Sequence, residues 1–156
     1  MDTGTKKMMK AGDSTFAMKA AQGGMAEVKM GQLAADKATN PDVKAFGQQM
    51  VDDHTKANND LKSVAQAENM TLPTDVNAKQ QAMYDRLSKM SGPAFDKMYV
   101  NGMVKDHVED VRDFQKEATA GQDPQVKNFA STTLPVLQGH LSKIKGIQSS
   151  MGSKGM

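Results

Sequence analysis

The sequence of 156 residues contains no cysteine and no tryptophan, and its other aromatic residues are only 2 Tyr and 5 Phe. Without cysteine the chain cannot form disulfide bonds, thiolate-held zinc or iron–sulfur sites, or a cysteine nucleophile. The shortage of aromatic residues argues against a β-rich fold, because strands favour aromatic and β-branched side chains. A metal ion bound by this chain would therefore need histidine, carboxylate or methionine ligands.

The chain also lacks a large excess of charge of either sign, and it lacks long apolar runs. The 20 Lys and Arg residues nearly balance the 18 Asp and Glu residues, which leaves a net charge of +2. Such a balance, without a long basic run, does not favour nucleic acid as a partner. No stretch approaches the roughly 18–20 apolar residues of a membrane span, and the first residues lack the apolar segment of a signal peptide. The sequence therefore predicts no nucleic-acid partner and no membrane span, and it indicates no particular protein partner.

The residues that are abundant, such as Ala, Met, Lys and Gln, favour helices, and four long segments begin with helix-start signals. Asp13 opens the first segment, and Asn40, Ser91 and Asp123 each precede a proline by one or two residues. A capping side chain followed by an early proline is typical of a helix N-terminus. The predicted helices cover residues 13–38, 40–69, 91–120 and 123–149.

The lengths of the connections predict how these helices are arranged. Short turns join the first helix to the second and the third to the fourth, so each pair forms an antiparallel hairpin. Residues of about 70–92 form a long crossover, and Val76, Met83 and Leu87 at helical spacing predict a short helix within it. A long crossover between two hairpins is typical of ferritin-like bundles. We therefore expect an all-α, ferritin-like four-helix bundle.

Both ends of the chain lack a periodic apolar pattern and contain Gly, Ser and Lys. We therefore expect flexible tails over residues 1–12 and 149–156, which flank a single bundle domain over 13–148.

The second and fourth helices begin alike, since Asn40 and Asp123 are each followed by Pro-x-Val-Lys-x-Phe. Internal duplication of a hairpin explains this similarity, and so does shared capping chemistry. Both explanations stay open at the level of sequence.

Each predicted helix carries one strongly polar residue on a seam of apolar or small residues spaced three and four apart. These residues are Glu27, His54, His107 and His140, and they include every histidine of the chain. Each lies near the middle of its helix, so the four would meet in one layer of the bundle. Three neutral imidazoles and one carboxylate can hold a divalent ion. The alternative is a buried, metal-free cluster of hydrogen-bonded His and Glu.

Residues near these four could support the site. Asp53, Asp106 and Asp110 are possible acceptors for imidazole N–H groups, and Asp110 has the best helical placement, one turn beyond a histidine. Met50 and Met103 each lie one turn before a histidine, where a thioether could reach copper, although methionine commonly fills bundle cores. The Glu-x-x-His pairs of dinuclear sites are absent. We expect one ion, with zinc favoured and copper or iron as alternatives.

Several segments carry a resemblance to a known family, namely residues 16–33, 40–46, 50–54, 92–99, 104–107 and 133–140. In these segments the sequence resembles the bacterial exported proteins of the domain of unknown function 4142 family. The resemblance covers about residues 13–147. It implies a ferritin-like four-helix fold, a location in the periplasm or cell envelope, and a ligand set at Glu27, His54, His107 and His140. It implies no activity, because the family is named for lacking one.

The seam residues predict a metal-binding bundle that either buffers the ion or pins the four helices in register, and the resemblance implies that it is exported. Four protein ligands would close the coordination of a tetrahedral ion, which argues against catalysis. Two alternatives stay open. One is a metal-dependent redox enzyme that acts on peroxide or superoxide and needs an open coordination position. The other is a metal-free envelope stress or structural protein.

Overall fold

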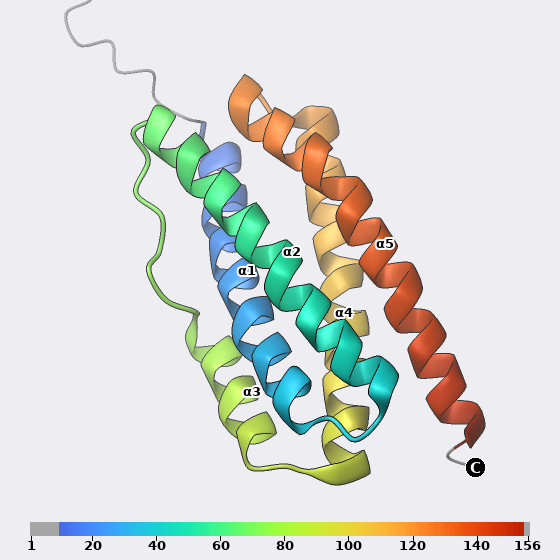
Figure 1. The fold of residues 1–156 in the computed structure, drawn as a ribbon. Helices are drawn as coiled ribbons and strands as arrows, with labels where there is room; N and C mark the ends of the chain where they lie inside the picture. The colour runs from blue at the N-terminus through green and yellow to red at the C-terminus, as the bar shows by residue number, and fades with distance from the viewer. Residues whose placement is uncertain (1–9, 155–156) are drawn as a thin grey trace, which may run out of the picture.

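Five helices make up the fold of residues 10–154, the part of the chain that the computed structural model describes (Figure 1). They are α1 (Ala11–Lys37), α2 (Pro41–Ala67), α3 (Ala78–Ser88), α4 (Gly92–Ala120) and α5 (Pro124–Lys154). Within these residues there is no strand. The predicted all-α fold is confirmed, and no helix of the described region is long and apolar enough to cross a membrane.

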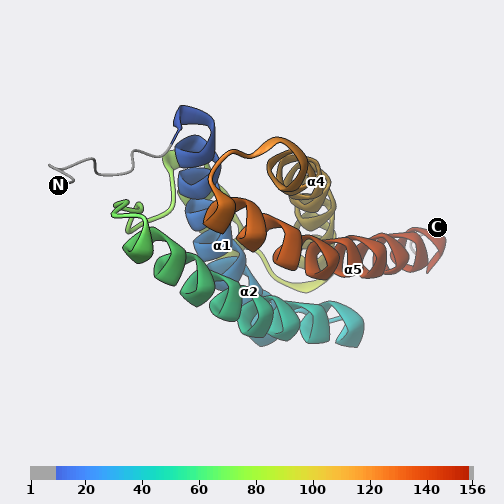
Figure 2. The ribbon, with the colours of Figure 1, turned by 90° about the horizontal axis from the view of Figure 1, so that it is seen from above.

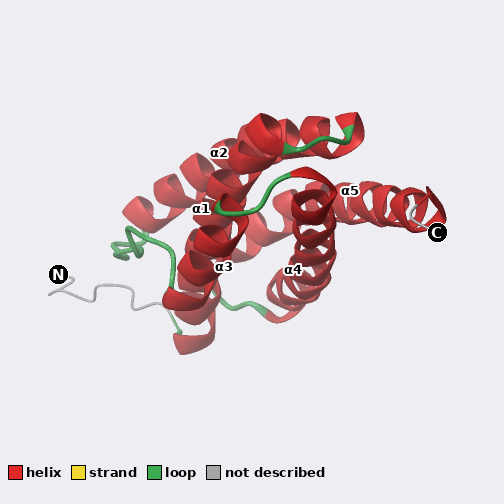
Figure 3. Ribbon diagram, turned by 90° about the horizontal axis from the view of Figure 1, so that it is seen from below, coloured by secondary structure: helices red, strands yellow, loops and turns green. Residues whose placement is uncertain are grey.

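The four long helices form two antiparallel hairpins. α1 packs mainly against α2, and α4 packs mainly against α5. Figure 2 shows the two pairs side by side, and Figure 3 shows the opposite end of the bundle. The short helix α3 lies in the crossover between the hairpins and contacts α1 and α4. The predicted four-helix bundle with a helix in its long crossover is therefore confirmed.

Capping side chains explain where several helices begin. Asn40 accepts a hydrogen bond of 2.8 Å from a backbone N–H in the first turn of α2, with proline at the first helical position. At the start of α3, Asn77 and Gln80 form a reciprocal capping box. Asp123 accepts hydrogen bonds from two backbone N–H groups in the first turn of α5. The starts of α2 and α5 lie within one residue of the predicted ones.

The structure differs from the sequence expectation at both ends of the chain. α1 begins at Ala11, so the last residues of the expected N-terminal tail are helical, while residues 1–9 lie outside the described region. The tail expected over residues 149–156 is helical as far as Lys154. Met151 packs against the core there, and this contact offsets the low helix propensity of the surrounding Gly and Ser residues.

The core consists of two apolar clusters along the bundle. One contains the large residues Phe46, Met50, Phe95, Tyr99 and Met103, and the other contains Phe16, Leu61, Phe114, Phe129 and Leu137. Met50 and Met103, which the sequence placed near the histidines, are thus core residues that are at most 1% exposed. Methionine fills irregular gaps well because its side chain is long and unbranched.

α1 and α2 approach each other closely at a pair of glycines. A Cβ atom on Gly31 would lie 2.8 Å from the carbonyl oxygen of Gly47, and a Cβ atom on Gly47 would lie 2.6 Å from that of Gly31. Because these neighbours are backbone atoms, a side chain at either position would push the helices apart. The contact sets the depth of α2 against α1, and His54 lies two turns further along α2.

A buried aspartate from each hairpin holds the loop of the other hairpin. Asp96 of α4 accepts hydrogen bonds from the backbone N–H groups of Thr39 and Asn40 and from the Thr39 hydroxyl, at 2.7–3.2 Å. Asp13 of α1 accepts hydrogen bonds of 3.1 and 2.9 Å from the backbone N–H groups of residues 122 and 123. Both aspartates are 2% exposed. This reciprocal arrangement supports internal duplication of the hairpin.

Candidate metal centre

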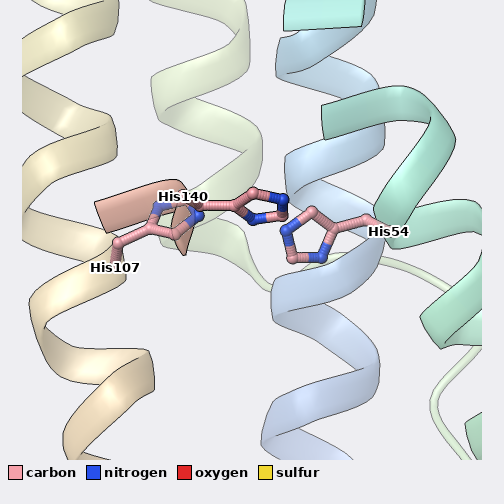
Figure 4. A group of neighbouring side chains, drawn as sticks. All are labelled: His54, His107 and His140. Carbon is pink, nitrogen blue, oxygen red and sulfur yellow. The ribbon is translucent and has the colours of Figure 1, made fainter. Parts of the chain in front are cut away.

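The three histidines of the chain come from three helices and point toward one another in the bundle interior (Figure 4). His54 lies on α2, His107 on α4 and His140 on α5, and their exposed fractions are 6%, 0% and 1%. One ring nitrogen from each lies within 4.8 Å of the other two. A tetrahedral zinc ion separates its ligand nitrogens by about 3.4 Å, so small side-chain rotations would bring these nitrogens to bonding distance. This histidine triad is a group that could hold a metal ion.

Aromatic side chains border the histidine triad. The ring of Phe46 packs edge-on against His107 and His140, with ring centroids 6.1 and 6.2 Å apart. His54 faces a small cavity lined in part by Phe114 and Phe129 of the second core cluster. The triad therefore forms a polar layer between two apolar clusters, where electrostatic interactions are strong because water is scarce.

Hydrogen bonds fix the tautomers of two histidines. His107 donates from Nδ1 to the backbone carbonyl oxygen of Met103 at 2.9 Å, which leaves the Nε2 lone pair available. His140 donates from Nε2 to Oδ2 of Asp53 at 2.7 Å, which leaves the Nδ1 lone pair available. Metal-binding histidines characteristically donate their second N–H to a carbonyl or carboxylate oxygen in this way.

The carboxylate that forms a hydrogen bond with a histidine is that of Asp53. The sequence favoured Asp110 instead, because it lies one turn beyond His107 on the same helix. Asp53 lies on α2 beside His54 in sequence, but its side chain reaches across to His140 on α5. Among the described residues no hydrogen bond joins Asp106 or Asp110 to a histidine, and Asp110 instead lines the cavity next to His54. Spacing along one helix could not identify a partner that belongs to another helix.

Each long helix contributes one buried polar atom to this region that has no hydrogen-bond partner among the described residues. These atoms are His54 Nε2, His107 Nε2, His140 Nδ1 and Glu27 Oε2. A buried polar atom without a partner costs roughly 1–3 kcal/mol. A cation bound between the three histidines would give their three nitrogens a partner. The four residues are the same four that the sequence places on the helix seams.

Glu27 of α1 lies in the bundle interior at 2% exposure, but it is not part of the histidine group whose ligand atoms lie within 4.8 Å. Burial raises the pKa of Glu27 well above its usual value, and the charges of Asp110 and Asp106 raise it further. Burial therefore favours the protonated, neutral form of Glu27, and a nearby cation would oppose this shift. The structure brings three of the four predicted ligands together, with Glu27 buried but outside that group.

Tyr99 is a polar residue of this region that the sequence reasoning missed. Its hydroxyl is buried without a hydrogen-bond partner in the described region. Burial raises the pKa of Tyr99 well above its usual value, and the charge of Glu27 raises it further. Tyr99, Met103 and His107 are spaced by four residues on one face of α4, which is the signal that could have indicated it.

Burial also keeps the imidazoles neutral. It lowers the pKa of His54 to about 3 and that of His107 to about 4, and neighbouring imidazoles contribute to both reductions. Burial lowers the pKa of His140, although its bond to Asp53 opposes this shift. Neutral imidazole is the form that binds a metal ion. The triad is therefore ready to bind a cation at neutral pH without losing protons.

Comparisons with known proteins place this chain in a family and identify its fold. A family model described as Domain of unknown function (DUF4142) matches residues 1–147. No match is found among curated proteins.

Two solved structures share the fold. One is a DUF305 fragment from Deinococcus radiodurans, with 10% identity, a TM-score of 0.79, and coverage of 91% of this chain and 98% of that one. The other is a putative secreted DUF305 protein from Streptomyces coelicolor, with 12% identity, a TM-score of 0.74, and coverage of 90% and 94%. At these identities the likeness concerns the fold alone. Since the family model spans nearly the whole sequence, the protein belongs to the DUF4142 family of unknown function.

Proposed function

We propose that this protein binds one divalent metal ion in the bundle interior through His54, His107 and His140, with Glu27 as the fourth ligand. The observation that carries this proposal is the set of four buried and unpartnered donor atoms, one from each long helix. Three nitrogen donors and one oxygen donor suit a tetrahedral zinc ion, which we favour. Copper and iron accept the same donors and are the alternatives.

The charges of the surrounding residues support a cation at this position. Three neutral imidazoles would leave the double charge of the ion uncompensated in an apolar interior. The Glu27 carboxylate halves that charge, and Asp53 places a second carboxylate behind His140. A bound cation in turn favours the ionised form of Glu27, whose charge is otherwise suppressed by burial.

The proposed role of the ion is buffering or structural pinning. An ion bound to all four residues would join α1, α2, α4 and α5 at one depth of the bundle and would stabilise the folded state by mass action. We further propose a location in the periplasm or cell envelope, which rests on the resemblance of the sequence to exported proteins.

A second candidate function is metal-dependent chemistry on a small oxidant such as peroxide. One observation favours it: the group of three histidines does not include Glu27. Three protein ligands leave one coordination position open, as in catalytic zinc sites. The Glu27→Gln variant separates the two candidates, because only the four-ligand site should lose most of its affinity when this carboxylate is removed.

Metal content tests the main proposal directly. Protein purified without chelators is expected to contain close to one equivalent of a divalent metal by elemental analysis. The metal-free protein should take up one equivalent of Zn²⁺ in a calorimetric titration, with Cu²⁺ and Fe²⁺ titrated for comparison. If it took up none of these three ions, the proposal would be wrong.

Removing the carboxylate behind His140 should weaken binding without abolishing it. Asp53→Ala is expected to lower Zn²⁺ affinity by about 10–100-fold, the usual cost of losing a hydrogen-bond partner of a metal-binding histidine. Asp52→Ala is the matched control, because Asp52 is the exposed neighbour and contacts Gln48 on the same helix. Equal affinities of the two variants in a competition titration would contradict this role of Asp53.

The pH dependence of Zn²⁺ affinity should show whether Glu27 is a ligand. While Glu27 is protonated in the metal-free protein, binding must release its proton, so Zn²⁺ affinity should rise about tenfold per pH unit. His54 and His107 add no such slope above pH 5, because their pKa values are about 3 and 4. Zn²⁺ titrations at several pH values between about 5.5 and 7.5 would measure this slope. Glu27→Gln should flatten it, and an equal slope in that variant would exclude Glu27 as a ligand.

A further inference from the structure

An ion that reaches the histidine triad must pass through the bundle wall, because all three histidines are at most 6% exposed. A small cavity of about 20 Å³ lies against His54, and residues of α1, α2, α4 and α5 line it. This is space for about one water molecule. Asp110 and Thr133 line the cavity as well, so its wall offers oxygen atoms to a cation.

Asn58 borders both the cavity beside His54 and the surface of the molecule. It follows His54 by one turn on α2, so the two side chains lie on the same helix face. Asn58 also lines two surface grooves of about 530 and 330 Å³ between α1, α2 and the crossover segment. The same side chain therefore borders the interior cavity on one side and open grooves on the other.

Gly24 of α1 leaves room for the amide of the Asn58 side chain. A Cβ atom on Gly24 would overlap the amide oxygen of Asn58, and no other residue's atoms are as near. The amide thus occupies the space that a side chain at position 24 would fill. Because it is the far end of a flexible side chain, it can move aside without a shift of the backbone.

We propose that the cavity beside His54 is a transit site for the metal ion and that Asn58, seated on Gly24, is the gate that closes it. This inference rests on the proposed metal centre. In this proposal the amide, when it lies against Gly24, blocks the passage of an ion between the cavity and the grooves that Asn58 also lines. When the amide rotates away, an ion can pass from the grooves to the oxygen atoms of Asp110 and Thr133 and then to the nitrogen of His54.

Exchange kinetics test the gate. Asn58→Ala removes the amide, and Gly24→Ala displaces it without changing Asn58 itself. Both variants should speed Zn²⁺ uptake and its release to excess chelator by about tenfold, which corresponds to about 1.4 kcal/mol of barrier. The equilibrium affinity should stay the same, because the ligands are untouched. Asn59→Ala is the matched control, since Asn59 is exposed and borders the groove of about 330 Å³ but does not line the cavity beside His54.

The outcomes separate the gate from the metal centre and from general loosening of the fold. Unchanged exchange rates in both variants, with normal Zn²⁺ affinity, would overturn the gate and leave the metal centre standing. Failure of the wild-type protein to bind any metal would overturn both. A loss of affinity that parallels the faster release would indicate a loosened site instead of an opened path and would also overturn the gate. Asn58→Leu, which keeps the bulk, should restore slow exchange.

Discussion

Replacing His107 with alanine is expected to lower Zn²⁺ affinity by more than about 100-fold. Loss of a hydrogen-bond partner of a metal-binding histidine costs at most roughly that much, and this variant loses a histidine that binds the metal directly. It should also eliminate the thermal stabilisation that the ion gives to the wild-type protein. At a free ion concentration about 1,000 times Kd, binding stabilises the folded state by about 4.1 kcal/mol. For a domain of this size, that corresponds to a rise in Tm of roughly 8–16 °C.

The measurement is a pair of melting curves, with and without Zn²⁺, for each protein. Val104→Ala is the control, because Val104 lies on the same helix and is a partly buried residue packed against the core. That variant should melt at a lower temperature but keep the full rise on adding Zn²⁺. A His107→Ala protein that retained the wild-type rise would show that the ion binds elsewhere, and the proposed centre would be wrong.

Asp96→Ala is expected to cause the largest loss of stability that is independent of metal. The Asp96 carboxylate accepts hydrogen bonds from the two backbone N–H groups and the hydroxyl of residues 39 and 40. Its removal leaves three donors without their partner in a partly buried loop. At roughly 1–3 kcal/mol for each unpaired group, the free energy of unfolding should fall by about 3–5 kcal/mol, allowing for partial access of water.

Urea unfolding of the metal-free protein would measure this loss. Asp36→Ala is a suitable control, since Asp36 is exposed and accepts a hydrogen bond from Gln32 of its own helix; its effect should stay within about 0.5 kcal/mol. Asp13→Ala, which removes the reciprocal contact at the other loop, should resemble Asp96→Ala in direction. A loss below about 1 kcal/mol for Asp96→Ala would mean that the loop is held by other contacts.

The hydrogen bond of His140 with Asp53, in place of one between His107 and Asp110, shows what spacing along a single helix cannot predict. Residues three or four apart on one helix are neighbours whatever surrounds them, so Asp110 was a reasonable partner for His107. The observed partner pair is Asp53 and His140, which come from α2 and α5. That contact depends on how two helices are rotated and shifted relative to each other, and no spacing within either helix contains this information.

Glu27 illustrates the same limit for the ligand set. Its seam position correctly indicated a buried residue, and its carboxylate has an unpartnered oxygen as the histidines have unpartnered nitrogens. Helix packing decides how far Glu27 on α1 lies from the histidine triad, which comes from α2, α4 and α5. Whether the carboxylate completes the coordination is therefore the point that the Glu27→Gln measurements address.

The sequence by itself determined the helices, their order and the buried polar residue near the middle of each long helix. These features follow from local rules, because capping residues and prolines set helix starts and a period of 3.6 residues sets the buried face. Tertiary structure decided how the faces meet. The glycine contact between α1 and α2 sets their relative depth, and buried aspartates tie each hairpin to the loop of the other. Contacts between distant residues assign Asp53 to His140 and seat Asn58 on Gly24, because such pairings arise only when separate helices are packed at a defined depth and rotation.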